Sequence, residues 1–111
     1  MKLYNRKQFL ALPSGVVFTK DDADIDSFQI KGNTLGENDF NYQPLVSINS
    51  HEFHEHHAAV LSLRITSQGT ADFYNWYREG SYDTEGTFAV LESHEVRGLI
   101  DRLEQAWVEG Y

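Results

Sequence analysis

Residues 87–110 read TFAVLESHEVRGLIDRLEQAWVEG, and this stretch contains two elements with different hydrophobic periods. Residues 87–91 form the most apolar short run of the chain, which predicts a strand. After Ser93, apolar residues recur every three or four positions with charged residues between them, and Gly110 ends the pattern. This spacing predicts an amphipathic helix from about residue 94 to 108, packed by one face on a sheet. The expected packed residues are Val96, Leu99, Ile100, Leu103, Ala106 and Trp107.

An aromatic-rich run, residues 70–78, precedes this stretch and predicts a strand that forms a hairpin with residues 87–91. Successive side chains of a strand point to opposite faces, so about half of the rings would point away from the core. Exposed Tyr and Trp are favoured anchors in protein interfaces. We therefore predict that Tyr74 and Trp76, with Tyr82 in the following turn, bind a partner. The alternative is that another part of the fold covers the second face of the strand.

Shorter elements are expected in the first half of the chain. Asn5 is followed three residues later by Gln8, a capping-box pattern that predicts one or two helical turns over residues 6–11. Residues 40–48 fit either one bulged strand or two short strands, because Pro44 cannot donate a hydrogen bond to a sheet. Further short strands are expected at residues 16–19 and 28–30.

The middle of the chain allows two interpretations. Asn49 and Glu52 repeat the capping-box spacing and predict a helix from about residue 50 to 64. Residues 58–66 also alternate apolar and polar side chains at their end, which is typical of a strand. The cap and two adjacent alanines favour the helix. The order of elements then predicts one α+β domain over residues 1–111, with a mostly antiparallel sheet of four or five strands and the middle and C-terminal helices packed on it.

Charge narrows the classes of partner. Seventeen Asp and Glu against nine Lys and Arg give a formal charge of −8. Such a surface repels phosphate backbones and anionic lipid, which disfavours direct binding to nucleic acid or to membranes, and it suits a basic protein partner. Asp22 and Asp24 belong to an acidic cluster and are predicted to contact that partner. The cluster is not an EF-hand loop, because Ser27 and Asn33 stand where that loop needs Gly and Glu.

The absence of cysteine excludes disulfides, thiolate catalysis and thiolate metal ligands. The first residues contain no secretory signal pattern, and no run approaches the ~18 apolar residues of a membrane span. We therefore expect a cytoplasmic protein.

Four of the five histidines lie within residues 51–57, HEFHEHH. On a helix, His51, His54 and Glu55 would lie close enough together to bind Zn or Ni weakly. The His-Glu-x-x-His motif of zinc proteases is absent from this run. The alternative is a purely structural role, in which His57 is a half-buried residue on the apolar face of the helix.

Motifs for other chemistry are missing. No serine stands in a G-x-S-x-G elbow, and the only histidine outside the cluster is His94. The glycine spacings do not match the phosphate-binding loops GxxxxGK[ST] or GxGxxG. The sequence therefore favours a protein without enzymatic activity and without a cofactor.

Short motifs spread along nearly the whole chain include Asn5 to Leu10, Leu12 to Gly15, Ile30 to Gly32, Asn38 to Phe40, Arg78 to Gly80 and Phe88 to Glu92, with the helical stripe from Glu95 to Leu103. By these motifs the chain resembles a family of small uncharacterised proteins encoded by bacteriophages and prophages. The resemblance implies a bacterial cytoplasmic setting and no known catalytic activity, and it brings no functional residues with it. The histidine cluster is not part of the pattern.

These observations predict a small acidic accessory protein of phage type that acts by binding another protein, and that inhibits or modulates a host protein that binds nucleic acid. The alternative is a metal-binding protein or a small metal-dependent enzyme that uses residues 51–57. A homodimer with a structural role is a third reading.

Overall fold

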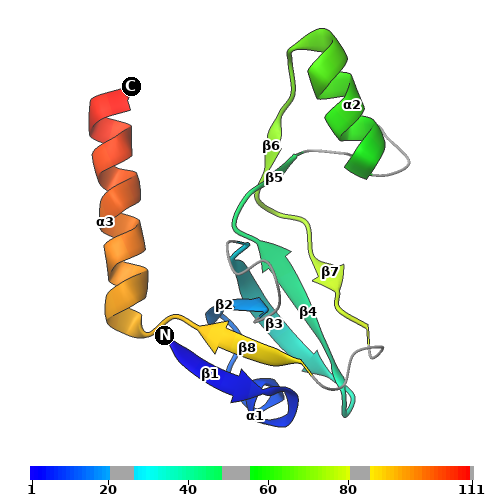
Figure 1. The fold of residues 1–111 in the computed structure, drawn as a ribbon, viewed down its shortest axis with the longest axis vertical. Coiled ribbons are helices and arrows are strands. Elements are labelled where there is room, and N and C mark those ends of the chain that lie inside the picture. The colour runs from blue at the N-terminus through cyan, green and yellow to red at the C-terminus, as the bar shows by residue number, and fades with distance from the viewer. Residues whose placement is uncertain (21–26, 49–55, 81–85, 111) are drawn as a thin grey trace.

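The computed structural model describes residues 1–20, 27–48, 56–80 and 86–110 (Figure 1). The fold is α+β, as expected, with one six-stranded antiparallel sheet, one two-stranded sheet, a middle helix and a long C-terminal helix. The strands are β1 (Lys2–Asn5), β2 (Val17–Lys20), β3 (Gln29–Leu35), β4 (Asp39–Pro44), β5 (Ser47–Ile48), β6 (Ala71–Asp72), β7 (Tyr77–Arg78) and β8 (Thr87–Val90), and the helices are α1 (Arg6–Leu10), α2 (His56–Thr66) and α3 (Ser93–Gly110).

The large sheet has the strand order β1-β8-β2-β3-β4-β7, and every neighbouring pair is antiparallel. The apolar strand β8 lies between β1 and β2, so Ala89 faces Leu3 on one side and Thr19 on the other. The small sheet pairs β5 with β6. The sheet is therefore larger than the four or five strands predicted, because the edge strand β1 was not expected.

The core consists of four phenylalanines, Phe9, Phe18, Phe40 and Phe88, each at most 1% exposed. Phe9 and Phe88 stack with ring centroids 4.1 Å apart, and Phe9 and Phe18 pack at 4.8 Å. Three of these rings come from strands and Phe9 comes from α1. The short helix α1 therefore closes the core against the large sheet.

Helix α1 begins as its sequence predicts. The Asn5 side chain accepts a hydrogen bond from the Gln8 backbone nitrogen at 2.8 Å, and the Gln8 side chain accepts one from the Asn5 nitrogen at 3.0 Å. This reciprocal cap satisfies two of the amides that a helix start leaves unpaired. The cap sets the position at which Phe9 enters the core.

Two predictions about the aromatic run are wrong. Residues 70–78 do not form one strand, because β6 and β7 are separate two-residue strands that belong to different sheets. The hairpin with residues 87–91 does not form either, since β7 pairs with β4 while β8 pairs with β1 and β2. Between the two short strands, Asp72 accepts a hydrogen bond from the Tyr74 backbone nitrogen at 2.9 Å, which replaces the regular pairing of a strand. For residues 40–48, the two-strand alternative is confirmed by β4 and β5.

The helical interpretation of residues 58–66 is confirmed, and α2 ends at Thr66 instead of about residue 64. The predicted start near residue 50 lies outside the described residues. Helix α2 contacts β5 of the small sheet, so it does not pack on the large sheet as predicted. His57 is exposed where we expected it to be half-buried, and Ala59, which is 2% exposed, is the buried residue of this helix.

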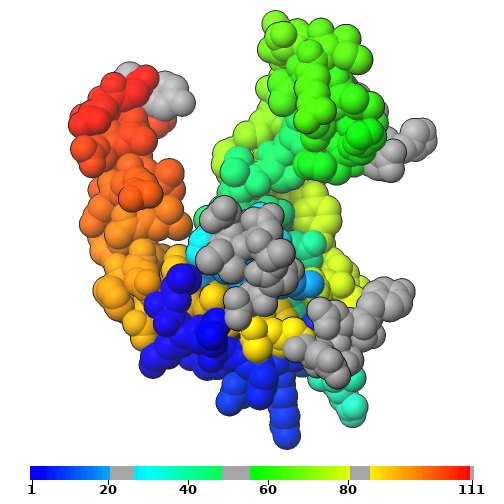
Figure 2. All heavy atoms as spheres, in the orientation of Figure 1, coloured from blue at the N-terminus to red at the C-terminus, as the bar shows by residue number. Residues whose placement is uncertain are grey.

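Helix α3 forms where it was predicted, but its packing differs. Within the described residues none of its side chains is buried, and Leu103 in the middle of its apolar stripe is 61% exposed. Figure 1 shows α3 rising away from the large sheet, and Figure 2 shows open space between the atoms of α3 and those of α2. The prediction that α3 packs on the sheet is therefore wrong, and the core position expected for it is filled from α1.

The two projecting parts extend the molecule. The Cα radius of gyration is 15.7 Å, whereas a compact domain of this length has a radius of about 13 Å. We call α3 the C-terminal arm, and we call β5, β6 and α2 together the middle arm. In Figure 1 both arms extend toward the top of the view, α3 following β8 and the middle arm following β4.

Candidate functional site

Among the described residues, four exposed aromatic side chains lie close together in residues 73–77, which run from the end of β6 to the first residue of β7, and we call this stretch the aromatic segment. Phe73 is 52% exposed, Tyr74 83%, Trp76 51% and Tyr77 36%. Rings of this size are usually covered in a folded domain, because each buries a large apolar area. The segment therefore presents a substantial apolar surface to solvent.

The end of the aromatic segment is attached to the large sheet through β7. Tyr77 pairs with Tyr42 in the register of β7 and β4, and their rings stack with centroids 5.8 Å apart. Burial raises the pKa of Tyr42, and the negative charge of Glu79 raises it further. The partly buried Tyr42 ring supports the Tyr77 ring.

The start of the aromatic segment is held by polar side chains. Asp72 accepts hydrogen bonds from the Tyr74 backbone nitrogen at 2.9 Å and from the side chain of Asn75. Gln43, in β4, donates a hydrogen bond to the carbonyl of Phe73. These bonds fix the backbone of a segment that has no regular strand pairing of its own.

Trp76 lies directly over the backbone of β3. A Cβ atom built on Gly32 would lie 2.8 Å from Cζ3 of the Trp76 ring, closer than real Cβ contacts. Only glycine leaves room for the indole at this point. The strand is irregular here, since its register with β4 shifts between Lys31 and Thr34.

The buried side chain of Lys31 stabilises this irregularity. Its Nζ donates hydrogen bonds to the Gly32 carbonyl at 3.2 Å and to Thr34 Oγ1 at 3.1 Å, and Thr34 in turn donates to the Leu10 carbonyl at 2.6 Å. Burial lowers the pKa of Lys31. The amine therefore links the floor beneath Trp76 to the end of α1.

A second polar network holds the chain just after the aromatic segment. The buried carboxylate of Asp39 accepts hydrogen bonds from the backbone nitrogens of Phe40 and Gly80, both at 2.8 Å, and forms an ion pair with Arg78. The hydrogen bond from Arg78 makes the largest contribution to lowering the pKa of Asp39. Arg6 donates to the Gly80 carbonyl at 2.9 Å from the opposite side. Gly80 has a φ of 84°, a conformation that glycine adopts without strain.

Of the residues predicted to bind a partner, the structure places Tyr74 and Trp76 on this exposed segment. Tyr82, Asp22 and Asp24 lie outside the described residues, and their roles stay predictions. His51, His54 and Glu55, predicted as metal ligands, also lie outside the described part of the chain. Their metal-binding role and the choice of Zn or Ni therefore stay predictions as well.

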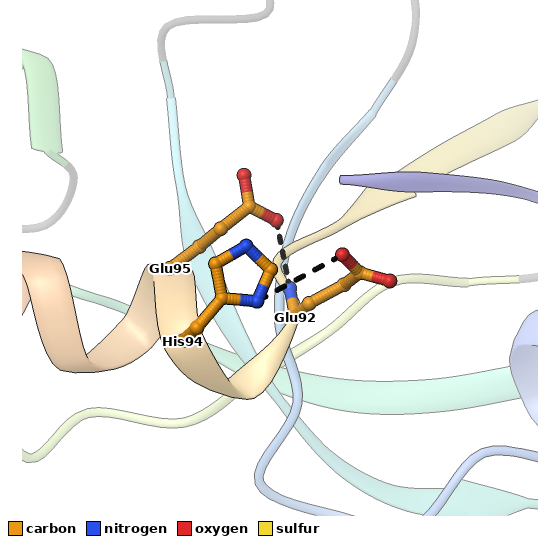
Figure 3. Close-up of side chains that lie close together, drawn as sticks. All are labelled: Glu92, His94 and Glu95. Carbon is orange, nitrogen blue, oxygen red and sulfur yellow. Dashed lines mark hydrogen bonds and ion pairs between the residues drawn. The ribbon is translucent and has the colours of Figure 1, made fainter.

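A different group of metal-ligand residue types comes together at the base of α3 (Figure 3). One ligand atom from each of Glu92, His94 and Glu95 lies within 4.8 Å of the others. The sequence prediction did not identify this group, although its signal is visible as a carboxylate, a histidine and a second carboxylate at a helix start.

Both carboxylates of this group already have cationic or amide partners. Glu95 accepts a hydrogen bond from the Met1 ammonium at 2.6 Å and one from the Glu92 backbone nitrogen at 3.0 Å, and these two bonds lower the pKa of Glu95. Glu92 lies 3.5 Å from the Lys2 ammonium. The arrangement caps α3 and ties it to β1, which is a structural role.

Comparison with known protein families, with curated proteins and with solved structures finds no match to this chain. Among the described residues, no helix combines the length and the apolar character needed to cross a membrane.

Proposed function

We propose that this protein works by binding another protein through the aromatic segment, without chemistry of its own. The observation that supports this most directly is the exposure of the rings at residues 73–77 on a hydrogen-bonded backbone. Tyr74 is 83% exposed, yet its backbone nitrogen is held by Asp72. A backbone that is already ordered loses less conformational entropy on binding, so more of the contact energy of its rings appears as affinity.

The geometry favours a shallow contact with a partner's apolar patch. Trp76 rests on Gly32 and Tyr77 rests on Tyr42, so these two rings are supported from below and offer their outer sides. Tyr and Trp are enriched among the interface residues that contribute most to affinity, because each joins a large apolar area to one polar atom. The segment supplies several such anchors within a few residues.

Charge indicates the chemistry of the partner. The formal charge of −8 favours a basic surface, which a negatively charged protein attracts and reaches faster at low salt. Together with the resemblance to phage-encoded proteins, this points to a bacterial host protein whose basic surface binds nucleic acid. A protein bound there would compete with the nucleic acid and inhibit or modulate the host protein.

The test is affinity capture from a bacterial host lysate with wild-type protein and with a Tyr74→Ser variant. We expect wild-type protein to retain one dominant basic partner that is released by high salt, since screening weakens attraction between exposed charges. Tyr74→Ser should lose at least about tenfold in affinity for that partner, as removal of an interface anchor does.

The matched control is Leu3→Ser, which removes a similarly exposed apolar side chain from the edge strand β1, where Leu3 is 64% exposed. This control should bind like the wild type. Equal loss of binding in both variants, or capture of nothing above background by wild-type protein, would refute the proposal.

A further inference from the structure

The C-terminal arm presents an uncovered apolar stripe. Ile100 is 41% exposed, Leu103 61%, Trp107 71% and Val108 75%. With Glu104 they line a shallow hollow along the helix. An amphipathic helix in a soluble protein normally buries such a face, because exposed apolar area costs free energy. A contiguous apolar face of this kind marks an interaction surface.

The spacing of the stripe is the same in both directions along the helix. Val96, Ile100, Leu103 and Trp107 are separated by four, three and four residues. Two such helices in antiparallel orientation therefore place Ile100 beside Leu103 of the second helix, and the small Val96 beside the large Trp107. Pairing of large with small side chains lets the two faces interlock at an ordinary distance between helices.

One edge of the stripe carries complementary charges. Arg97 and Glu104 are seven residues apart, about two turns, and so lie on the same edge of α3. A two-fold axis perpendicular to the helix brings the same edge of two copies together. Arg97 of each copy then faces Glu104 of the other. The alignment of these charged residues differs by less than about one helical turn from the alignment that the apolar residues set. A parallel pair would bring opposite edges together and would not align these two residues.

We propose that α3 binds α3 of a second copy of this chain in antiparallel orientation, with the stripe from Val96 to Trp107 as the core of the interface and two Arg97 to Glu104 ion pairs at one edge. In the single chain Arg97 lies 3.0 Å from Asp101, and both side chains are more than half exposed. Exposed ion pairs of this type contribute little to stability, so Arg97 can leave Asp101 and pair with Glu104 of the second copy at a small cost in free energy.

Other charges act against the pairing, and they predict its salt dependence. On the second edge, the same axis places Arg102 near Arg102 of the other copy, and each chain carries a net charge of −8. Added salt screens both repulsions and also the two Arg97 to Glu104 attractions, and it leaves the apolar contact in place. Self-association should therefore persist or strengthen as ionic strength rises, whereas binding to a basic partner should weaken. The two interactions are thus distinguishable in one buffer series.

The first experiment measures molar mass by light scattering after size exclusion, at chain concentrations from about 1 to 100 µM. We expect wild-type protein to reach twice its 12.8 kDa chain mass. Leu103→Glu should weaken self-association by about a hundredfold or more, because the change enters the two-fold interface twice. Gln105→Glu is the matched control, since it adds the same charge at an exposed position about 160° around the helix from Leu103. This control should still form the dimer.

The second experiment tests the orientation. Arg97→Glu and Glu104→Arg each place like charges at both ion pairs, so each variant alone should associate about tenfold more weakly. An equimolar mixture of the two variants should recover wild-type association, because every contact in the mixed dimer then joins unlike charges. The double variant R97E/E104R should recover it as well. Circular dichroism of each variant confirms that α3 stays helical.

A wild-type chain that remains at its single-chain mass at 100 µM overturns the proposal. Equal behaviour of Leu103→Glu and Gln105→Glu overturns the assignment of the stripe. A dimer that the charge mixture does not rescue overturns the antiparallel arrangement. None of these outcomes bears on the aromatic segment, because Tyr74 and Trp76 lie on a different part of the chain.

Discussion

The large sheet and the two arms use apolar residues in opposite ways. In the sheet, Phe9, Phe18, Phe40 and Phe88 meet in one cluster in which each ring is at most 1% exposed. In the arms, residues of the same hydrophobic class remain on the surface, with Ile65 of α2 81% exposed and Leu103 of α3 61% exposed. Stability is therefore concentrated in the sheet, and the arms are available for contact with other molecules.

This difference shows why the arms are not required to complete the fold. The core is closed by Phe9 from the five-residue helix α1, and neither the core cluster nor the hydrophobic residues packed against it include a residue of α3. The polar networks around Asp39 and Lys31 lie in the sheet and fix the floor of the aromatic segment. The sheet thus acts as a rigid support, and changes in the two regions should have separable effects.

The largest effect is expected in the phenylalanine cluster. Phe18→Ala should lower the free energy of unfolding by about 3 to 5 kcal/mol, because it removes a fully buried ring and leaves a cavity. Urea denaturation measures the change. The control is Phe73→Ala in the aromatic segment, where the ring is 52% exposed and the loss should be well under half as large. Equal losses would mean that the two regions are not energetically distinct.

The next effect is expected at the junction between the sheet and the end of the aromatic segment. Asp39→Asn should cost about 1 to 3 kcal/mol, because a buried charged acceptor of two backbone amides becomes neutral. Its folded pKa is lowered, so its stabilisation is present above the carboxyl pKa of the unfolded chain and is lost as pH falls through the folded pKa. Urea titrations between pH 3 and pH 7 should therefore show a shallower acid loss in the variant, and an unchanged acid limb would count against this role.

A smaller effect should link the sheet to the aromatic segment. Gly32→Ala places a methyl group in collision with Asn41 Oδ1 and 2.8 Å from the Trp76 ring, so both side chains must shift. Overpacking of this kind costs about 1 to 3 kcal/mol. The ring should move outward, with a shift in tryptophan emission toward longer wavelength. Gly98→Ala is the control, because a Cβ at Gly98 meets nothing within 4 Å. An emission spectrum unchanged by Gly32→Ala would show that Trp76 is not supported by β3.

The smallest effect is expected at the tip of the middle arm. Ile65→Ser should change the free energy of unfolding by no more than about 0.5 kcal/mol, since the side chain is 81% exposed. Urea denaturation again measures it. A loss above about 1 kcal/mol would show that this residue is covered in solution, and the contrast between sheet and arms would then need revision.

Local sequence patterns were sufficient to predict the elements that are stabilised by contacts between residues close together in the chain. The capping box of Asn5 and Gln8, the helical period of residues 93–110 and the helix over residues 58–66 depend on contacts within a few positions along the chain. The exposure of Tyr74 and Trp76 was also anticipated, from the alternation expected of a strand, although residues 73–77 do not form one.

The pairing of strands that are distant in the sequence could not be predicted from local patterns. Strand β8 pairs with β1 and β2 and not with the preceding aromatic run. Strand pairing and register depend on which apolar faces meet in the folded sheet, and a local pattern does not contain that information. The amphipathic pattern of α3 shows that one face is apolar but does not state what covers it. Only the tertiary arrangement shows that this face stays exposed, since the core cluster is formed by the strands and by Phe9 of α1 and contains no residue of α3.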